Sequence, residues 1–583
     1  MQTVEVKLDR FDGGITSDGR DNSAGLVKMI KHFDVLTTPH TLIPFNSRTS
    51  GDVSSATQQM TDFFYYNSLV YGIGVDSGTS KTTVHKIAPA DFAAATWSSM
   101  GNNASAAGTF VRGVWVEYQG YGFGINSDGT VFRNSLSGAA WADTVTTIGS
   151  AIGAVGSIAG LVHSKDDRLY LASANVIASV PSATGTWVAS ALTLPARYLI
   201  TSLCEYGNYL AIACKPKYAG NSVVFLWDRN SSVTTLSESI DWGYGNLQII
   251  EQVEGELIGI TIRNNVFTGL PEKLVFRHYI SGAGSVIFKE LNITGGSTDG
   301  KIYTGKKFNA NRLYFIADIS VDGVLHNGIW GLGKNQAGRW IVWFDKLPNN
   351  DTAVASSAMR GFFMIGDSAW ISYEDSGYKL TQTITTGTYT GTSLLETTIQ
   401  NAGDASKKKG LVGVTVTFDT LPTAGVVILK YRKDGETSWT QIFTEGTDGL
   451  ISRSATSIEN LTAGGDTVTI SIATPAVVTF TAHKLVAGQK IRFSTTGALP
   501  TGITAGVDYY VLSTSLAADT FKFSDTVGGT AINTSGSQSG THTIDRKVEL
   551  PEFKEIEFRI ESTGGAKITG LSFKANILDQ KPY

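Results

Sequence analysis

The sequence predicts an all-β protein, and three observations lead to this prediction. Apolar and polar residues alternate with period two over most of the chain, in segments rich in Val, Ile, Thr, Tyr and Phe. Gly, Asn, Asp and Ser mark the breaks between these segments. One turn-plus-strand pattern also recurs along the first two thirds of the chain. With 42% hydrophobic residues, the chain can bury a large core, which excludes disorder.

The N-terminal segment, residues 1–48, is expected to be an arm and a lead-in to the repeats. Met1–Leu8 alternates and lacks the apolar core of a signal peptide, and no stretch of the chain reaches about 18 apolar residues. We therefore expect no export signal and no membrane segment. Asn22–Phe33 is the best helix candidate because its apolar residues fall at helical spacing, although Gly25 leaves the assignment ambiguous.

Seven copies of the repeat follow, each a short polar turn and an alternating strand. They are Tyr66–Gly74, Tyr118–Asn126, Lys165–Ser173, Tyr206–Cys214, Val253–Thr261, Asn309–Ala317 and Gly366–Glu374. Their starts lie 41 to 57 residues apart, which is typical of β-propeller blades. We expect a closed ring of about seven blades over residues 49–384, with each copy as an inner strand. The alternative is a series of ordinary antiparallel meanders.

The two cysteines, Cys204 and Cys214, flank a predicted hairpin turn near Gly207-Asn208. A hairpin centred there places Cys204 opposite about residue 211 and Cys214 opposite about residue 201. The two sulfurs are then out of register and too far apart to bond. We therefore expect two buried thiols and synthesis in a reducing cytosol.

The residue pattern changes beyond Thr381, where a Thr- and Gly-rich connector leads into longer predicted strands. Residues 385–460 and 546–583 carry the alternation expected of a β-sandwich, with a hairpin signal at Asp434-Gly435. Residues 461–545 between them have their own strands and turns. The simplest topology is a sandwich interrupted by an inserted β-module, since insertions are tolerated at exposed hairpin tips.

Two stretches resemble bacteriophage virion proteins. The first is the inserted module, which runs from His483 through Gly488, Phe493, Pro500 and the tyrosine pair Tyr509-Tyr510 to Phe523, and resembles a small β-module of phage tail and virion proteins.

The second resemblance is longer and combines several features. An opening at Phe11–Ile15, the segment Lys31–Leu36, a propeller and a terminal sandwich with Trp439 and Arg559 are together similar to phage virion propeller proteins. These include the nozzle or hub rings of short tails. The resemblance implies a structural subunit of a virion tail.

Catalytic, cofactor and metal sites are not predicted. The eight histidines are His32, His40, His85, His163, His278, His326, His483 and His542, and none has a second ligand at metal-binding spacing. His483 is expected to be a turn or hydrogen-bonding residue. Because propellers often host glycosidases, we considered the acids Asp166, Asp167, Glu254 and Asp318, which fit turn positions equally well.

Three further patterns have structural explanations. Ser127–Thr130 resembles a sialidase Asp-box but occurs once, so we expect a hairpin turn. Lys407–Lys409 is the one compact basic run and is expected to be a solvated loop, with contact to DNA or a neighbouring subunit as the alternative. The aromatic residues in early repeats are expected to pack between blades rather than stack on sugars; they are Tyr65, Tyr66, Trp115, Tyr118 and Tyr121.

Three functional hypotheses follow. The favoured one is a non-enzymatic structural subunit of a phage tail nozzle or hub. It would be made in the host cytoplasm and assembled with copies of itself, for example as a hexamer, around a conduit through which DNA passes transiently. Its other partners would be neighbouring tail, adaptor or fibre proteins. A receptor- or glycan-binding spike or head decoration protein is the alternative, and a glycan-degrading propeller enzyme is the third. The net charge of −4 gives no basic surface for nucleic acid binding.

Overall fold

A computed structural model describes residues 2–578 apart from short internal segments. These segments are residues 17–19, 21–25, 37–39, 45, 53–57, 77–80, 91–96, 103–109, 127–128, 139–140, 149–157, 231–235, 266–267, 294–300, 310, 322–323, 347–358, 366–367, 375–377, 389–390, 460–465, 484 and 486. The described residues form β-strands and turns without an α-helix, which confirms the all-β prediction. Nor do they include a helix long and apolar enough to cross a membrane.

The middle of the chain folds into seven consecutive four-stranded antiparallel sheets. The first sheet contains β7 (Gln58–Tyr66), β8 (Leu69–Asp76), β9 (Lys81–Ile87) and β10 (Ser98–Asn102). The second contains β11 (Phe110–Tyr118), β12 (Tyr121–Asn126), β13 (Thr130–Ser135) and β14 (Trp141–Thr147). The third contains β15 (Ile158–His163), β16 (Arg168–Ser173), β17 (Val176–Val180) and β18 (Val188–Thr193). The fourth sheet contains β19 (Tyr198–Tyr206), β20 (Tyr209–Pro216), β21 (Asn221–Trp227) and β22 (Glu238–Tyr244). The fifth contains β23 (Asn246–Val253), β24 (Glu256–Asn264), β25 (Pro271–Ile280) and β26 (Gly284–Asn292). The sixth contains β27 (Lys301–Asn309), β28 (Arg312–Val321), β29 (Val324–Lys334) and β30 (Trp340–Lys346). The seventh sheet contains β31 (Met359–Ile365), β32 (Ser368–Glu374), β33 (Tyr378–Thr388) and β6 (Asn46–Asp52).

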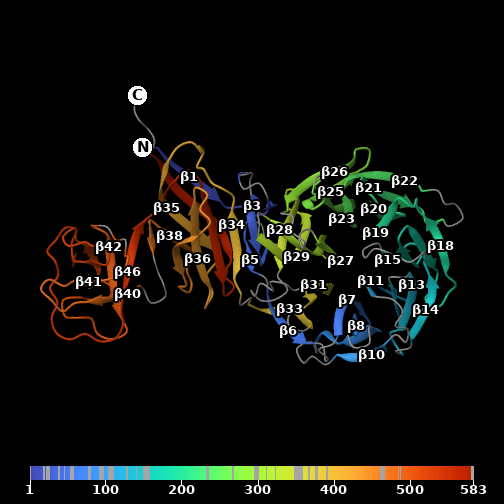
Figure 1. The fold of residues 1–583 in the computed structure, drawn as a ribbon, viewed down its shortest axis with the longest axis horizontal. Coiled ribbons are helices and arrows are strands. Elements are labelled where there is room, and N and C mark those ends of the chain that lie inside the picture. Colours follow the sequence, from blue (N-terminus) through green and yellow to red (C-terminus); the bar gives the residue numbers. More distant parts are fainter. Residues whose placement is uncertain are drawn as a thin grey trace.

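These sheets are arranged in a ring, which we call the ring (Figure 1). The first strand of each sheet contacts the first strand of the next, in the order β7, β11, β15, β19, β23, β27 and β31, and β31 contacts β7 again. Strand β6 precedes the first sheet in sequence but pairs with β33 in the seventh sheet. One sheet therefore holds strands from both ends of the ring, which ties the ring closed. At the same junction, the rings of Trp97 and Trp370 meet edge to face at 6.3 Å.

The polar turns of the repeat join the first and second strands of the sheets. Both central residues of the turn have positive φ at Asn67-Ser68, Gln119-Gly120 and Glu254-Gly255. Positive φ at both positions is characteristic of a type I′ hairpin turn. Each repeat strand is thus the second strand of its sheet. The strand before the turn, rather than the repeat strand itself, lies innermost in the ring.

The hairpin around the cysteines has the predicted register. Cys204 pairs with Ala211, and Cys214 pairs with Ile200, one residue from the predicted partner because the register shifts between Ile200 and Ser202. Both side chains are buried, and the two cysteines do not form a disulfide. The prediction that they do not form a disulfide is confirmed.

Two larger sheets pack against each other beside the ring, and we call them the two-sheet unit (Figure 1). The five-stranded sheet contains β1 (Thr3–Leu8), β49 (Ile568–Ile577), β35 (Lys409–Phe418), β38 (Ser452–Ala455) and β47 (Glu552–Phe553). The six-stranded sheet contains β2 (Gly14–Ile15), β3 (Leu26–Lys31), β34 (Ser393–Thr397), β48 (Ile556–Thr563), β36 (Val426–Lys433) and β37 (Thr440–Glu445). Between the sheets, the rings of Phe558 and Phe573 lie 5.1 Å apart.

The N-terminal segment lies within this unit rather than forming a separate arm. Strand β1 pairs with β49, and β3 pairs with β34. The helix prediction for residues 22–33 is wrong, because the described residues 26–31 form β3. This strand belongs to the six-stranded sheet and also contacts β30 of the ring. Met29 and Ile30 are consequently both buried, so the strand lacks simple alternation and its apolar spacing imitates that of a helix.

The inserted residues have a separate core, and we call this part the insert. Its strands are β39 (Ser457–Glu459), β40 (Asp466–Ile470), β41 (Val478–Thr479), β42 (Lys490–Thr495), β43 (Asp508–Val511), β44 (Thr520–Phe521), β45 (Phe523–Ser524) and β46 (His542–Glu549). The chain enters through β39 and returns through β46, and these two strands pair with each other. Phe493 and Phe523 lie in a hydrophobic cluster that contains residues of the insert alone.

A single hydrophobic core joins the ring to the two-sheet unit. It contains Phe276 and Trp343 of the ring together with Ile30, Leu429 and Phe573 of the two-sheet unit. The junction is close: a Cβ atom added to Gly14 would lie 2.8 Å from the carbonyl oxygen of Val342. The short pair β4 (Phe33–Asp34) and β5 (Ile43–Pro44) follows β3 at this junction. The ring and the two-sheet unit are therefore packed as one body.

Candidate functional site

A cavity of about 370 Å³ lies where the ring meets the N-terminal segment of the two-sheet unit. The N-terminal segment contributes Arg10, Gly13 and Leu26 to its wall. The ring contributes residues of β26, of β30 and of the β29–β30 turn, namely Phe288, Lys289, Asn335, Ala337, Arg339, Trp340 and Ile341. The site thus exists because distant parts of the chain are packed together.

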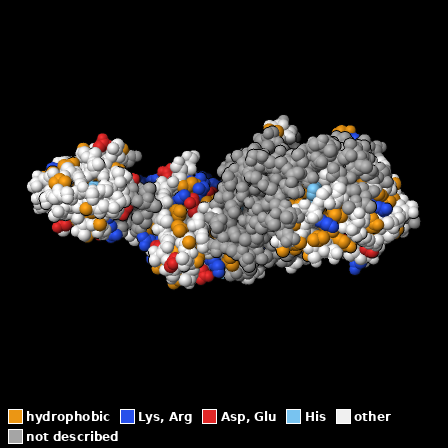
Figure 2. Space-filling model, turned by 90° about the horizontal axis from the view of Figure 1, so that it is seen from below, with side chains coloured by type: hydrophobic (Ala, Val, Ile, Leu, Met, Phe, Trp, Pro, Cys, Tyr) orange, Lys and Arg blue, Asp and Glu red, His pale blue; other side chains and the backbone are white. Residues whose placement is uncertain are grey.

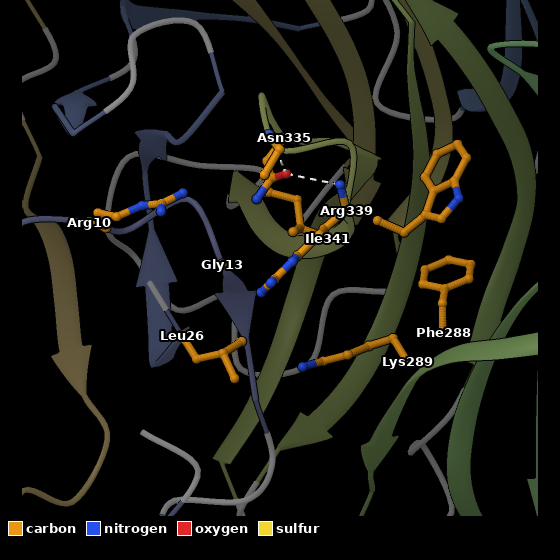
Figure 3. Close-up of a pocket in the computed structure, with 10 residues that line it drawn as sticks. Arg10, Gly13, Leu26, Phe288, Lys289, Asn335, Arg339 and Ile341 are labelled. Atoms are coloured by element: carbon orange, nitrogen blue, oxygen red, sulfur yellow. Dashed lines mark hydrogen bonds between the residues drawn. The ribbon is translucent and has the colours of Figure 1, made fainter. Parts of the chain in front are cut away.

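The described residues that line the cavity include three cationic side chains. Figure 3 shows the side chains of Arg10, Lys289 and Arg339 extending toward the cavity from three different segments. Arg10 donates hydrogen bonds from Nε and Nη2 to the carboxylate of the largely buried Asp12, at 3.3 and 3.1 Å. The hydrogen bond and the charge of Asp12 raise the pKa of Arg10. Asp12 thus offsets the charge of Arg10.

The backbone that carries Arg339 is held by Asn335. The Asn335 Oδ1 atom accepts hydrogen bonds from the backbone N–H groups of Ala337 at 3.1 Å and Arg339 at 3.0 Å. Its Nδ2 atom donates to the backbone oxygen of Asp12 at 2.9 Å. Gly338 has φ of +72°, as this tight turn requires. One buried amide therefore fixes the turn and ties it to the N-terminal segment.

A β-bulge places two consecutive residues on the cavity wall. Phe276 pairs with Lys289, whereas Arg277 pairs with Ile287, so Phe288 is an extra residue in β26. In a regular strand, neighbouring side chains point to opposite faces. The bulge removes this alternation locally and allows Phe288 and Lys289 to line the same cavity.

Trp340 is held in place by a polar network centred on Glu256. The carboxylate accepts hydrogen bonds from Trp340 Nε1 at 3.1 Å and Lys334 Nζ at 2.6 Å, and His278 Nδ1 lies 2.6 Å from it. Lys334 also lies over the Trp340 ring, at 4.7 Å from its centre. Burial by itself raises the pKa of Glu256, but the hydrogen bonds from Lys334, His278 and Trp340 outweigh it and hold this pKa below its usual value.

The acids that the sequence offered as candidates for a glycosidase pair are not among the described residues that line the cavity. Asp166 accepts hydrogen bonds from Tyr170 at 2.6 Å and from Arg229 at 3.1 Å, and Asp167 lies in the same turn with φ of +45°. Glu254 is a turn residue with φ of +48° whose carboxylate lies 3.8 Å from Lys334. These three acids therefore occupy turns, one of the two interpretations that the sequence left open. For Asp318 the turn interpretation is wrong, because its backbone is paired on both sides within β28; its side chain is outside the described residues.

The histidines are not gathered into a metal site in the described part of the chain, where no group of three or more metal-ligating side chains occurs. His483 is a hydrogen-bonding residue, one of the two roles expected for it: its Nδ1 accepts from the backbone N–H of Leu485 at 2.9 Å. Its ring packs edge to face against Phe521 at 5.3 Å.

The prediction of a solvated loop holds for Lys407 and Lys408, whose side chains are 43% and 50% exposed, but it is wrong for Lys409. Lys409 begins β35 and is fully buried, and its Nζ donates to the backbone oxygens of Lys407 and Lys554 at 2.6 and 3.0 Å. Lys407 and Lys408 form ion pairs with Asp404 and Glu552. Lys409 is buried because sheet pairing places it in β35, which a charge pattern in the sequence does not indicate.

The early aromatic residues are mostly structural. Trp115 and Tyr118 are buried, and Tyr118 donates to the backbone oxygens of Asp167 and Pro181 in the next sheet. Tyr65 is 43% exposed. The central residues of the Asp-box-like segment, 127 and 128, lie outside the described residues, whereas Gly129 occupies a left-handed position with φ of +84°.

Comparisons with known proteins give limited information. No family model matches the chain, and no curated protein matches it. Among solved structures, BamB from Moraxella catarrhalis is 14% identical over 66% of this chain and 98% of its own, with a TM-score of 0.36. The computationally designed Ika8 protein is 11% identical over 56% of this chain and 97% of its own, with a TM-score of 0.32. At these low scores, neither likeness supports an argument about function.

Sequence reasoning missed the cavity residues. Arg10 lies hundreds of positions before Lys289, and strands β27, β28 and β29 lie between Lys289 and Arg339. None of the three residues lies in a recognisable motif. The one local signal was the turn sequence Asn335-Gln-Ala-Gly338, which contains residues that favour tight turns.

Proposed function

We propose that this chain is a structural component of a bacteriophage particle, most specifically a ring-forming subunit of a tail nozzle or hub. The resemblance of the insert and of the whole domain order to phage virion proteins supports this assignment. The structural observation that supports this role most strongly is the single hydrophobic core that joins the ring to the two-sheet unit. A part that transmits force or defines a conduit needs such a connection between its domains.

The proposal includes a finer description of the fold. We infer that the ring is a seven-bladed β-propeller, that the two-sheet unit is a β-sandwich, and that the insert is a small β-domain placed within it. The closed order of first strands and the pairing of β6 with β33 support the propeller. Closure matters for a particle subunit because it leaves fewer long sheet edges that could recruit other chains.

Identical subunits of this kind would assemble through heterologous contacts that close by rotation. In this proposal, copies of the chain, for example six, surround the path of the genome and contact neighbouring tail, adaptor or fibre proteins. Figure 2 shows basic and acidic side chains intermixed over the two-sheet unit on the face that it displays. A surface with both signs of charge suits a conduit that lets DNA pass without holding it.

Mass spectrometry and immunogold labelling of purified particles test this function. The protein is expected in several copies per particle, with label at the tail. Its absence from particles that are otherwise complete would contradict the proposal.

A second candidate function is recognition of a host receptor or glycan by the insert. Its separate core and its position at the end of the molecule opposite the ring favour this alternative (Figure 1). If the isolated protein binds host surface polysaccharide and deletion of residues 467–543 abolishes binding, recognition replaces the nozzle role. Release of reducing sugar from the polysaccharide would instead indicate an enzyme.

A further inference from the structure

We propose that strand β1 is a contact through which two copies of this chain pair edge to edge, about a two-fold axis at Val6. The partner is therefore a second copy of the chain, and the contact continues the five-stranded sheet from one copy into the other. Such an isologous contact differs from the heterologous contacts proposed above for the particle. It holds or fails independently of the structural role in a particle.

Strand β1 is an edge of the five-stranded sheet. Among the described residues it pairs with β49 and with no other strand. Directly before β1, the backbone oxygen of Gln2 accepts a hydrogen bond from the N–H of Ile577 at 3.0 Å. Because the residues that bond to a given neighbour alternate along an antiparallel strand, the backbone groups of Glu5 and Lys7 face away from β49. An edge of this kind is a template for pairing with another chain.

The apolar side chains of β1 keep part of their surface exposed. Val4, Val6 and Leu8 pack against the core between the two sheets but are only partly buried there. A second copy of β1 beside the first would cover their exposed parts and continue the row of apolar side chains. This gain requires a register in which the apolar faces of both copies lie on the same side, because a slip by one residue reverses the faces.

The charged side chains of β1 select one such register. Two-fold axes at Glu5 and at Val6 both keep the apolar faces together and overlap most of β1. An axis at Glu5 would place the Glu5 carboxylates of the two copies opposite each other. An axis at Val6 instead places Glu5 of each copy opposite Lys7 of the other copy. Opposite charges directly across an antiparallel pair stabilise it and like charges destabilise it, so the axis lies at Val6.

The surroundings of β1 fit this register. The side chains of Lys7 and Glu5 are 69% and 42% exposed, so a second copy can reach both. On the inner side, Lys574 of β49 lies 3.8 Å from Glu5, and charges would therefore alternate from Lys574 through Glu5 to Lys7 of the second copy. His40 Nδ1 lies 2.8 Å from the backbone oxygen of Asp9 directly after β1, which confines the pairing to β1. Figure 1 shows the N-terminus, which leads into β1, at the outer margin of the two-sheet unit and away from the ring.

Sedimentation equilibrium of the full-length protein tests the proposal. In about 50 mM NaCl we expect a monomer–dimer equilibrium with Kd below about 50 μM, and weaker dimerisation at higher salt because the two ion pairs are exposed. A protein that stays monomeric at about 200 μM overturns the proposal.

Charge variants of β1 test the register. K7E places carboxylates opposite each other in both pairs, and E5K places ammonium groups opposite each other, so each variant alone should dimerise at least about tenfold more weakly. An equimolar mixture of K7E and E5K has opposite charges in both pairs. We expect it to form a mixed dimer with Kd within about threefold of the original value.

K567E is the matched control. Lys567 is 44% exposed, pairs with Asp419 and lies outside β1, and its substitution makes the same change in charge as K7E. It is expected to change Kd less than about twofold. Equal weakening by K7E and K567E, or a mixture of K7E and E5K that dimerises as weakly as its components, would show that the contact does not have this register and would overturn the proposal.

Discussion

Asp34 and Arg312, 278 positions apart in the sequence, form an ion pair of 3.3 Å across the junction between the two-sheet unit and the ring. Asp34 ends β4, and Arg312 begins β28 of the sixth sheet. Each side chain is 19% exposed, so the pair is largely removed from water. It lies beside the shared hydrophobic core and gives the junction a polar contact of defined geometry.

Breaking this pair is expected to destabilise the body of the protein. D34N or R312Q each leaves a partly buried charge without its main partner, and we expect a loss of about 1–2 kcal/mol in the free energy of unfolding. Urea denaturation measures this loss. D419N is the control, since Asp419 pairs with Lys567 at 3.7 Å on an exposed surface, and should cost less than about 0.5 kcal/mol. Equal effects of the junction and surface variants would contradict the importance of the pair.

Gly259 is expected to be required by the packing between the fourth and fifth sheets. A Cβ atom at this position would lie 2.6 Å from the indole nitrogen of Trp242, which is fully buried. G259A should therefore lower the free energy of unfolding by about 2 kcal/mol and change the fluorescence of Trp242. G413A is the matched control, because its nearest neighbour would be the Ala455 oxygen at 3.7 Å. A G259A protein as stable as G413A would show that these two sheets do not pack as described.

The insert is expected to be dispensable for the rest of the fold. Glu459 and Lys547 are paired where the chain enters and leaves the insert, so an Asn-Gly turn can join them in place of residues 460–546. This deletion should leave the main melting transition within about 2 °C of the original, because the insert has its own core. Calorimetry checks this prediction. Loss of the main transition would show that the insert stabilises the two-sheet unit.

The Glu256 network is expected to make stability depend on acid. The folded pKa of Glu256 is lowered from its ordinary value of 4.5. Its contribution is therefore fully present above about pH 4.5 and is lost as the pH falls through the lower folded pKa. The E256Q variant lacks this titration. The difference in melting temperature between the original protein and E256Q should be largest near neutral pH and shrink below pH about 4. A difference independent of pH would contradict the assignment.

Local patterns in the sequence were sufficient to predict the repeated units. The positive φ angles at Gln119-Gly120 and Glu254-Gly255 come from residues of the predicted turns, and the cysteine hairpin has its register within one residue. These features depend on neighbours in sequence, and for that reason the sequence alone could indicate them.

Features that depend on distant packing could not be predicted in this way. Met29 and Ile30 are buried on two sides by different domains, so β3 had the apolar spacing of a helix. Lys409 is buried through sheet pairing although it lies in a basic run. Arg10 and Arg339 line one cavity because the N-terminal segment packs on β30.

Cryo-electron microscopy of purified particles, at a resolution that separates strands, tests the central claim most directly. The account predicts several copies of the chain arranged around the tail axis. Each copy should contain seven radial sheets, with the two-sheet unit in a fixed orientation against them. Particles without this subunit, or copies whose ring and two-sheet unit take varied relative orientations, would contradict the account.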